Sequence, residues 1–545
     1  MLYSAWQLRV PKGVLKVTLA NLLVEADLRW SGNIQVRRQT SRHTRGCEIE
    51  CSPEAVPEFC GWLFSEKGYS FASLIAEEHE SQWELRYVWY GNGDDGIVLV
   101  VARQPLAEQT FATLIGHVHA IDWSEREVED LFGLVFKGHP RLGDFVLHDD
   151  RWNREITPMR NGSDASAPLI RCLPEREWRP LLVLEAPGAF AMPIGPIYSG
   201  VAESALFLLE TQGEDVVRCV PRLFYKYRGI EKIAEGKPIA HALLLAERCN
   251  GTSAFAHGLA FCQAAEAVCA VEAPGRAKGL RVLLAELERF RHHAGAIREI
   301  CESTGLLVGT SQAAILEEEL LSLSCAFTGH RYLFGLNTIG GLTRDFEPGH
   351  CLQLLATAHD ILKRLKQVEK MLRYSNSFLD RIEEVGIVTS DEAREFGLVG
   401  PIARGSGISR DVRKLQPYSG YDGFSFDVPC EKEGDGYARL RILFAEAEQS
   451  VRIMEQAVSV LPGGTVCAGP VQVSPGAALG WAEAPRGAAF HWLRIGVDGM
   501  VARYHLATPS FLNWNGFHLA AERFAFQDFP IIMATFGLSV AENDR

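Results

Sequence analysis

The sequence contains 545 residues, with 55 lysines and arginines against 68 aspartates and glutamates, which gives a formal net charge of −13 at pH 7. Such an acidic chain is poorly suited to follow nucleic-acid phosphates, so we expect no nucleic-acid partner. The length predicts several domains, and no apolar run approaches the roughly 20 residues that a membrane-spanning helix needs.

The early part of the chain predicts a β-hairpin. Apolar and aromatic side chains alternate over residues 83–89, a glycine-rich turn follows at 91–96, and residues 97–101 form a β-branched run. We expect a helix around residues 107–118. The predicted first domain, a small α+β domain, spans residues 1–156, and a linker follows at 157–180 because residues 157–168 are rich in Pro, Gly, Ser and Asn.

Beyond about residue 200, apolar side chains recur at helical spacing and predict a bundle of long helices over residues 181–545. Loops rich in Gly, Pro and Arg are expected at 400–407 and 483–487, where a cofactor site would form. The fold class is therefore α+β, with a sheet domain before a larger helical domain. Three stripes carry the helix prediction: Leu283, Leu287, Phe290, Ala294 and Ile297; Ala358, Ile361, Leu365, Val368 and Leu372; Leu440, Leu443, Ala447, Val451, Met454 and Val458.

The thirteen cysteines include no CxxC pair, so the sequence predicts buried reduced thiols and no autonomous zinc or iron–sulfur cage. The first residues carry charges throughout and lack the apolar core of a secretion signal. We therefore expect a cytoplasmic protein whose membrane role, if any, depends on partner proteins.

In the first domain, the run WSEREVEDLFG at residues 123–133, with Gly138-His139-Pro140 after it, resembles the signature of the small soluble C-type subunit of complex I, the 30 kDa type. Clustered acids beside Arg126, followed by a Leu-Phe-Gly turn, would present a mixed polar and apolar surface. We expect Glu125, Arg126 and Glu127 to dock a partner; a capped helix end is the alternative interpretation.

The second domain carries a series of short motifs: YRGIEK at 227–232, ELER at 286–289 with His293, TIGG at 338–341, PIAR at 401–404, DVR at 411–413, GDGYAR at 434–439 and EAPRG at 483–487. With these motifs the domain resembles the large subunit shared by complex I, where it is the D-type subunit, and [NiFe] hydrogenases. A single chain that joins both parts resembles the formate hydrogenlyase and energy-converting hydrogenase large subunits, and equally the fused C/D subunit of bacterial complex I. The resemblance implies a helical domain of that type and partner docking at Arg228, Glu231 and Lys232.

The chain departs from the hydrogenases at the metal site, which in that family needs two CxxC pairs because soft thiolates bind nickel and iron. Aligned on the neighbouring motifs, the four ligand positions are Asn250, Ser253, Ser539 and Glu542. Hydroxyls, an amide and one carboxylate are hard donors, so we expect no NiFe centre and no metal on this chain. A site for a hard ion at these positions is the alternative.

The chain also departs from complex I at the two residues that hold the quinone headgroup, whose carbonyls need proton donors. The family's histidine position holds Tyr198, and its tyrosine position holds Gly251. Tyr198 keeps a hydroxyl that could replace one donor, and Tyr227 replaces the histidine before Arg228. Both tyrosines could instead be satisfied residues of the core.

Three functions follow from the resemblance. In the first, the chain is a peripheral-arm subunit of a membrane-bound, complex I-like redox complex with electron transfer coupled to ion translocation; it would bind no cofactor itself, and quinone and NAD binding are implied for an assembly of this type. In the second it is a non-catalytic scaffold, and in the third an active formate hydrogenlyase-type subunit, which the missing thiolates disfavour.

The redox function assigns cavity-lining or catalytic roles to Tyr198, Arg404, Arg413 and Arg486. An open cavity beside a neighbouring iron–sulfur cluster would favour it, and bulky side chains such as Phe255 or Phe536 would favour the scaffold. The expected location is the cytoplasmic face of the membrane. The expected partners in this hetero-oligomer are an iron–sulfur small subunit of the complex I B type, a ferredoxin-like iron–sulfur subunit, and membrane proteins of the antiporter type and of the complex I H type.

Overall fold

The computed structural model describes residues 19–37, 46–91, 96–153, 155–163, 182, 184, 186–197 and 203–545. The chain divides into two compact units, residues 1–143 and 144–545. The predicted first domain extended to residue 156, but residues 144–153 pack with the second unit. Arg222 Nη2 donates to Asp150 at 2.7 Å, and His148 Nε2 lies 2.8 Å from the Leu223 carbonyl oxygen.

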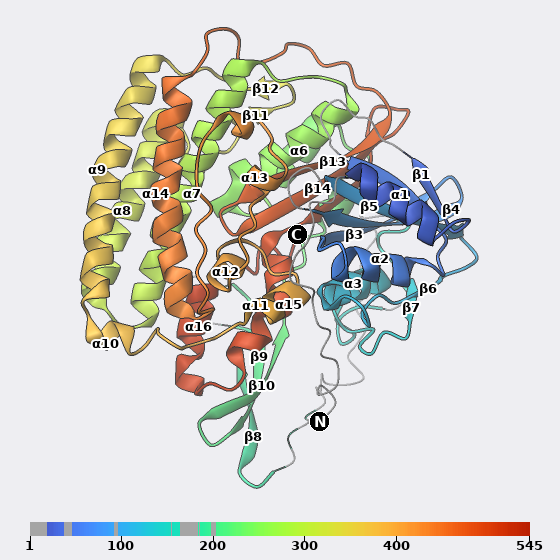
Figure 1. Ribbon diagram of the computed structural model, residues 1–545, viewed down its shortest axis with the longest axis horizontal. Coiled ribbons are helices and arrows are strands. Elements are labelled where there is room, and N and C mark those ends of the chain that lie inside the picture. The colour runs from blue at the N-terminus through green and yellow to red at the C-terminus, as the bar shows by residue number, and fades with distance from the viewer. Residues whose placement is uncertain are drawn as a thin grey trace. The chain divides into compact units, whose positions relative to one another are not determined.

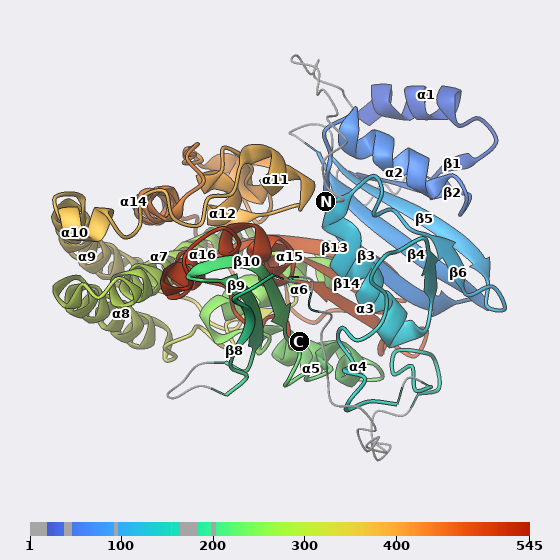
Figure 2. The same ribbon diagram turned by 90° about the horizontal axis from the view of Figure 1, so that it is seen from below.

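The first unit is built on a five-stranded sheet in the order β1-β2-β5-β4-β3, in which only the β2–β5 pair is parallel. Helices α1 and α2 lie together on one face of this sheet (Figure 2). The elements are α1 (Leu19–Arg29), β1 (Ile34–Arg37), β2 (Gly46–Cys51), α2 (Val56–Ser65), β3 (Ser70–His79), β4 (Gln82–Tyr90), β5 (Ile97–Pro105), β6 (Thr110–Ala112), η2 (His119–Ile121), α3 (Asp122–Phe132) and β7 (Val135–Lys137).

The predicted hairpin is confirmed as the antiparallel pair β4–β5, while its turn lies partly outside the described residues. The helix expected around 107–118 is wrong. Residues 110–112 form strand β6, which pairs in parallel with β7 and places the rings of Phe111 and Phe136 in contact. Pairing with a strand some 25 positions further along decides this segment, and local spacing gives no sign of it.

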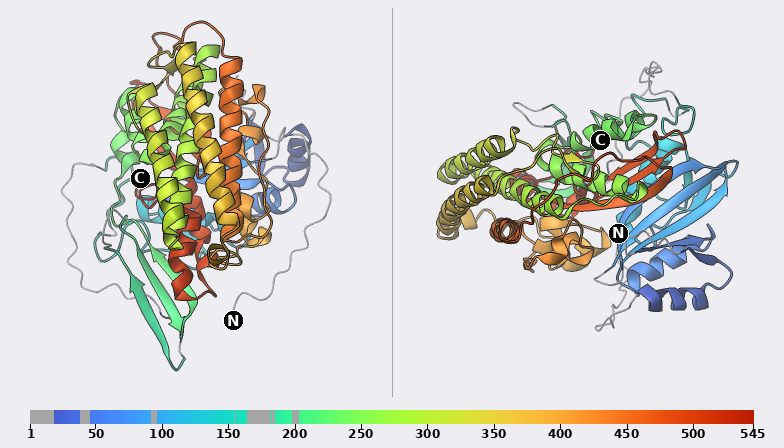
Figure 3. Two further views of the ribbon diagram at one scale, coloured as in Figure 1. Left: turned by 90° about the vertical axis from the view of Figure 1, so that its left-hand side faces the viewer. Right: turned by 90° about the horizontal axis from the view of Figure 1, so that it is seen from above.

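Four long helices, α7, α8, α9 and α14, lie side by side in the second unit (Figures 1 and 3). The three predicted apolar stripes fall on α7, α9 and α14, and all their members are buried except Val458, which is half-buried. The helices of this unit are α4 (Ile230–Ala234), α5 (Ile239–Glu247), η3 (Gly251–Ser253), α6 (Ala254–Val268), α7 (Gly275–Ser303), α8 (Leu307–Thr328), α9 (Pro348–Arg373), α10 (Asn376–Leu379), α11 (Ser390–Glu395), α12 (Gly400–Gly405), α13 (Val412–Leu415), η4 (Tyr421–Gly423), α14 (Gly436–Ser459), α15 (Pro509–Ala521), η5 (Phe526–Asp528) and α16 (Phe529–Phe536).

Two antiparallel three-stranded sheets accompany the bundle, in the orders β10-β9-β8 and β13-β14-β15, and α6 packs on the second. A separate two-stranded pair joins β11 to β12. The strands of this unit are β8 (Ala189–Ile194), β9 (Leu206–Gln212), β10 (Asp215–Arg222), β11 (Asn337–Thr338), β12 (Gly341–Leu342), β13 (Gly476–Ala484), β14 (Gly487–Ile495) and β15 (Val501–Ala507).

The segment at 400–407, expected to be a loop, begins with the short helix α12. Gly400 opens this helix with a φ of +68°, and a Cβ there would lie 2.0 Å from the carbonyl oxygen of Arg486. Only glycine tolerates both the backbone angle and the contact. The helix therefore sits directly against the tight β13–β14 turn, and this contact positions the Arg486 side chain.

Candidate functional site

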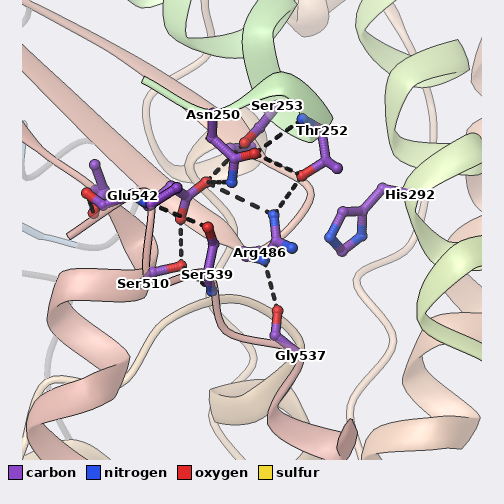
Figure 4. A network of polar contacts seen from close by, with 12 residues as sticks. Asn250, Thr252, Ser253, His292, Arg486, Ser510, Gly537, Ser539 and Glu542 are labelled. Atoms are coloured by element: carbon purple, nitrogen blue, oxygen red, sulfur yellow. Dashed lines mark hydrogen bonds and ion pairs between the residues drawn. The ribbon is translucent and has the colours of Figure 1, made fainter. Parts of the chain in front are cut away.

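Of the four positions aligned with the hydrogenase ligands, Asn250, Ser253 and Ser539 gather around the fourth, the buried Glu542 (Figure 4). Its Oε1 accepts hydrogen bonds from Asn250 Nδ2 at 2.9 Å and from Ser253 Oγ at 2.7 Å. Its second oxygen accepts a hydrogen bond from Ser510 Oγ. The amide, hydroxyl and carboxylate groups thus satisfy one another rather than facing an open coordination sphere.

Local structure places each of these groups. Asn250 caps η3, because its Oδ1 accepts from Thr252 N at 2.9 Å, and Ser253 ends η3 directly before helix α6. Ser510 lies in the first turn of α15. Ser539 follows α16, and its Oγ accepts from Glu542 N at 3.3 Å. Side-chain caps of this kind stabilise the helix ends and also fix the directions of the site's donors.

Arg486 completes the cluster from the β13–β14 turn. Its Nε donates to the Gly537 carbonyl oxygen at 2.6 Å, its Nη1 donates to Thr252 Oγ1 at 2.7 Å, and Nη1 lies 3.8 Å from Glu542 Oε1. Figure 4 shows His292 on the other side of Arg486 from Glu542. Arg486 therefore links the segments that carry η3, α16 and Glu542.

Electrostatics favours an ionised Glu542. Burial alone would raise the pKa of its carboxyl, but His257, Arg486 and Ser510 hold that pKa well below its usual range. The same burial, reinforced by Arg486, lowers the pKa of His292. At neutral pH the cluster therefore contains a carboxylate that accepts hydrogen bonds from Asn250, Ser253 and Ser510 and, beyond Arg486, a neutral imidazole.

Arg404 and Arg413, predicted to line a cavity, are bound in a buried ion-pair network. Arg404 Nε donates to Glu446 Oε1 at 2.6 Å, and its Nη1 donates to Glu483 Oε1 at 2.9 Å. Arg413 donates to Glu286 Oε1 at 2.8 Å and pairs with Asp411. All these side chains are almost fully buried, so they hold helices and strands together, and the cavity-lining role predicted for the two arginines finds no support in these contacts.

Arg228 and Glu231, predicted to dock a partner, contact residues 541–545 of the chain itself. Arg228 donates to the carbonyl oxygens of Cys249 and Ala541, at 2.7 and 2.5 Å. Glu231 is buried and contacts Arg545, with its Oε1 3.4 Å from Nε. Lys232 pairs with Glu235 at 2.8 Å. The segment that carries Glu542 is therefore anchored by two residues of the YRGIEK motif.

The docking residues predicted in the first unit lie in helix α3, which ends at Gly133 in the left-handed conformation, as the capped-helix interpretation predicts. Glu125 is fully buried: its Oε1 accepts from Leu114 N at 2.8 Å, and its Oε2 accepts from Thr113 Oγ1. Glu127 is buried as well, and Arg126 donates to the Gly143 carbonyl oxygen at 3.5 Å. Buried acids cannot contact a partner directly, so the two glutamates stabilise this unit.

Glu125 predicts a pH dependence. Burial, with Asp122 nearby, raises its pKa to about 8, so the folded chain binds a proton that the unfolded chain has released above about pH 4.5. The stability from this group is complete below pH 4.5 and is lost as the pH rises through 8, by at most about 1.4 kcal/mol per pH unit. We expect Glu125→Gln, which stays neutral, to flatten this fall.

Hydrogen exchange of the β3–β5 amides between pH 5 and 8.5, corrected for intrinsic rates, measures the effect. Glu129→Gln, a change in the same helix, is the control and should keep the wild-type pH profile. An unchanged slope in the Glu125→Gln protein would contradict the assignment.

Tyr198 and part of the loop around it lie outside the described residues. Sequence reasoning missed Ser510 and Thr252 as members of the Glu542 cluster, because neither carries a motif. The one available signal for Ser510 was the Thr-Pro pair before it, which marks a helix start. Within the described ranges, no group of three or more His, Cys, Asp or Glu side chains could hold a metal ion.

Comparisons with known proteins identify both parts of the chain. The family described as "Respiratory-chain NADH dehydrogenase, 30 Kd subunit" matches residues 49–168, and the one described as "Respiratory-chain NADH dehydrogenase, 49 Kd subunit" matches residues 305–474. The chain is 32% identical over 448 residues to the C/D subunit of NADH-quinone oxidoreductase from Bdellovibrio bacteriovorus, covering 80% of this chain and 79% of the relative. The chain belongs to the family of complex I C/D subunits.

Hydrogenase subunits are relatives within the same similarity range. Formate hydrogenlyase subunit 5 of Escherichia coli is 29% identical, with 90% of this chain and 87% of the relative covered, and hydrogenase-4 component G of the same species is 27% identical, with 82% and 78% covered. The predicted resemblance is therefore confirmed. Members of this complex I and hydrogenase family are oxidoreductase subunits of hetero-oligomeric complexes. Among the helices that the structure describes in this family member, none is long and apolar enough to cross a membrane.

Proposed function

We propose that this chain is a peripheral-arm subunit of a membrane-bound complex of the complex I and hydrogenase type, and that it works without a NiFe centre. In this role it sits next to an iron–sulfur subunit on the cytoplasmic side and takes part in coupling electron transfer to ion translocation. The electrons are carried by partner cofactors. The chain contributes the protein framework and the charged groups around Glu542.

The observation that carries this proposal is the hydrogen-bonded closure of the four former ligand positions. Nickel and iron in this family need four soft thiolates, whereas Glu542 here accepts hydrogen bonds from Asn250 and Ser253 and pairs with Ser539 through its backbone. These residues do not fit a bimetallic centre. Arg486, 3.8 Å from Glu542, adds a positive charge that also opposes cation binding.

The side chains that occupy the aligned ligand positions support a coupling role over metal catalysis. Phe536, considered as a plug, packs instead against Phe517 and Arg439. The Glu542 carboxylate and its polar partners occupy the ligand positions themselves. A site filled in this way holds a charge in a fixed place, which suits a protein that responds to the redox state of a neighbour.

Quinone-linked electron transfer is the second candidate, and it rests on Arg486 and His292. A quinone carbonyl needs hydrogen-bond donors, and the neutral His292 imidazole next to the Arg486 guanidinium offers two donor types side by side (Figure 4). Arg486→Met should then lower quinone reduction by about tenfold or more while the assembly still forms. Unchanged quinone reduction would remove this candidate.

The proposed function is tested by purifying the intact assembly through a tag on this chain. We expect iron and acid-labile sulfide, contributed by co-purifying iron–sulfur subunits, together with membrane subunits and no stoichiometric nickel. The formate hydrogenlyase large subunit, purified in the same way, is the control for nickel retention. One nickel per chain, or hydrogen turnover that depends on this chain, would refute the proposal.

A further inference from the structure

A row of four fully buried polar side chains runs from Glu542 into the β14–β15 sheet. His257 Nε2, on α6, lies 3.6 Å from Glu542 Oε1. His257 Nδ1 is 3.1 Å from His491 Nε2, and His491 Nδ1 is 2.9 Å from the hydroxyl of Tyr504. None of the four side chains is exposed to solvent.

The phenol and the two imidazoles of this row can each both donate and accept a hydrogen bond. A neutral imidazole carries one proton on either ring nitrogen, and a phenol has one hydrogen and two lone pairs. Two arrangements of opposite direction satisfy both short contacts, and the one that presents a proton to the Glu542 carboxylate has Tyr504 donating to His491 Nδ1 and His491 Nε2–H donating to His257 Nδ1. The remaining proton of His257 then sits on Nε2, which faces Glu542.

His257 and Glu542 are close but are not hydrogen-bonded to each other. A separation of 3.6 Å is too long for a hydrogen bond, and His257 Nε2 has no other hydrogen-bond partner in the described part of the chain. A buried N–H without a partner is costly, and Glu542 Oε1 is the carboxylate oxygen beside it. A small approach of the two side chains would both satisfy the nitrogen and complete the row.

The charges around the row fix its resting state. Burial, together with His257 and His505, lowers the pKa of His491, so the central imidazole of the row is neutral, while Glu542 at its end is ionised. At the other end, burial, Cys249 and Glu231 raise the pKa of the Tyr504 hydroxyl, and Arg545 opposes them. Arg486 is a charged neighbour at the Glu542 end. A hydrogen-bonded row of this kind can reverse its hydrogen-bond direction without adding a charge to either imidazole.

We propose that Tyr504, His491 and His257 form a proton relay that loads and unloads Glu542, and this rests on the proposed metal-free function of the site. A proton arriving on the Tyr504 oxygen sends the original hydroxyl proton to His491 Nδ1. The proton on His491 Nε2 moves to His257 Nδ1, and the proton on His257 Nε2 moves to Glu542. One proton is gained overall, both imidazoles change tautomer, and no electron is transferred. Glu542 is neutral only while it holds this proton, because its surroundings favour the ionised form and return the proton.

The relay is tested by nitrogen NMR of the purified full-length chain labelled with ¹⁵N-histidine, with the two signals assigned from His257→Gln and His491→Gln. In the wild type we expect each of these histidines to be a single Nε2–H tautomer. Glu542→Gln should lose the single tautomer at His491, which Glu542 does not touch. Tyr504→Phe should do the same at His257.

Tyr421→Phe is the matched control, because Tyr421 is an equally buried tyrosine whose hydroxyl donates to Glu286 outside the row. It should leave both histidine signals unchanged. If Glu542→Gln alters only His257, or Tyr504→Phe alters only His491, the four groups do not act as one relay and the proposal fails.

A measurement on the wild-type protein tests the relay even if the variants do not fold. The N–H···N hydrogen bond should give a two-bond ¹⁵N–¹⁵N coupling between His491 Nε2 and His257 Nδ1. Its absence would overturn the relay. Nickel in the purified assembly would refute the proposed function without changing this coupling, so the two failures are distinguishable.

Discussion

Replacing Arg404 with methionine is expected to lower the free energy of unfolding of the second unit by about 3–5 kcal/mol. The substitution leaves Glu446 and Glu483, both almost fully buried, without the guanidinium that they share. An unpaired buried carboxylate keeps its full desolvation cost, which is why breaking such a pair costs more than the pair contributes. Urea denaturation at pH 7, followed by circular dichroism of the helices, measures the change.

Arg452→Met is the control for this prediction, because Arg452 lies on the exposed side of α14 and pairs with Glu448 one turn away. Surface pairs of this kind contribute about 0.3–0.5 kcal/mol. The double variant Arg404→Met with Glu446→Gln should be less destabilised than the two single changes added together, because it removes both members of a coupled pair. Additive losses, or a loss no larger than that of Arg452→Met, would contradict the network.

Glu231→Gln is expected to destabilise the second unit by a similar amount, about 3–5 kcal/mol at pH 7. Glu231 lies 3.0 Å from Arg503 and 3.1 Å from His505, and its carboxylate accepts a hydrogen bond from Leu506 N at 3.0 Å. A neutral amide would leave the guanidinium groups of Arg503 and Arg545 without this counter-charge. Hydrogen exchange should also rise over residues 541–545, which Glu231 helps to anchor.

The pKa of Glu231 predicts in which direction the stability should change with pH. Although burial would raise it, His505, Arg503 and Arg545 hold the pKa of Glu231 far below its unfolded value of about 4.5. The stability from Glu231 is therefore complete above about pH 4.5 and is lost as the pH falls below it. The wild type and Glu231→Gln should differ most at pH 6–7 and converge in acid. Glu302→Gln, at an exposed pair with Arg298, should show no such convergence.

Periodicity predicted the elements whose neighbours are local or uniformly apolar. The alternation at 83–89 gave the hairpin, and the stripes at 283–297, 358–372 and 440–454 gave α7, α9 and α14. Residues 110–112 were assigned wrongly, because their strand partner lies at 135–137. The short helix at Gly400 depends on contact with the Arg486 turn, more than 80 positions away, which local composition does not reveal.

The candidate site shows the same contrast between features with a local sequence signal and features set by distant contacts. Motif spacing located Asn250, Ser253, Ser539 and Glu542, and the structure brings them together. The burial of Glu125 could not be predicted, because its partners Thr113 and Leu114 lie outside its helix. An exposed docking acid and a buried capping acid look identical in a sequence. His491 and Tyr504 lie on neighbouring strands of one sheet, and only their pairing shows that they meet.

The buried ion pairs also bear on how the long helices find their alignment. The apolar stripe of α14 would still find apolar neighbours if the helix slid along the bundle by one turn, because the hydrophobic effect has no preferred direction. The carboxylate of Glu446 would lose its partners, since Arg404 and His293 sit on two other helices at fixed points. Charges from α7, α12, α13, α14 and β13 thus select a single register, and they specify the bundle even where they add little to its stability.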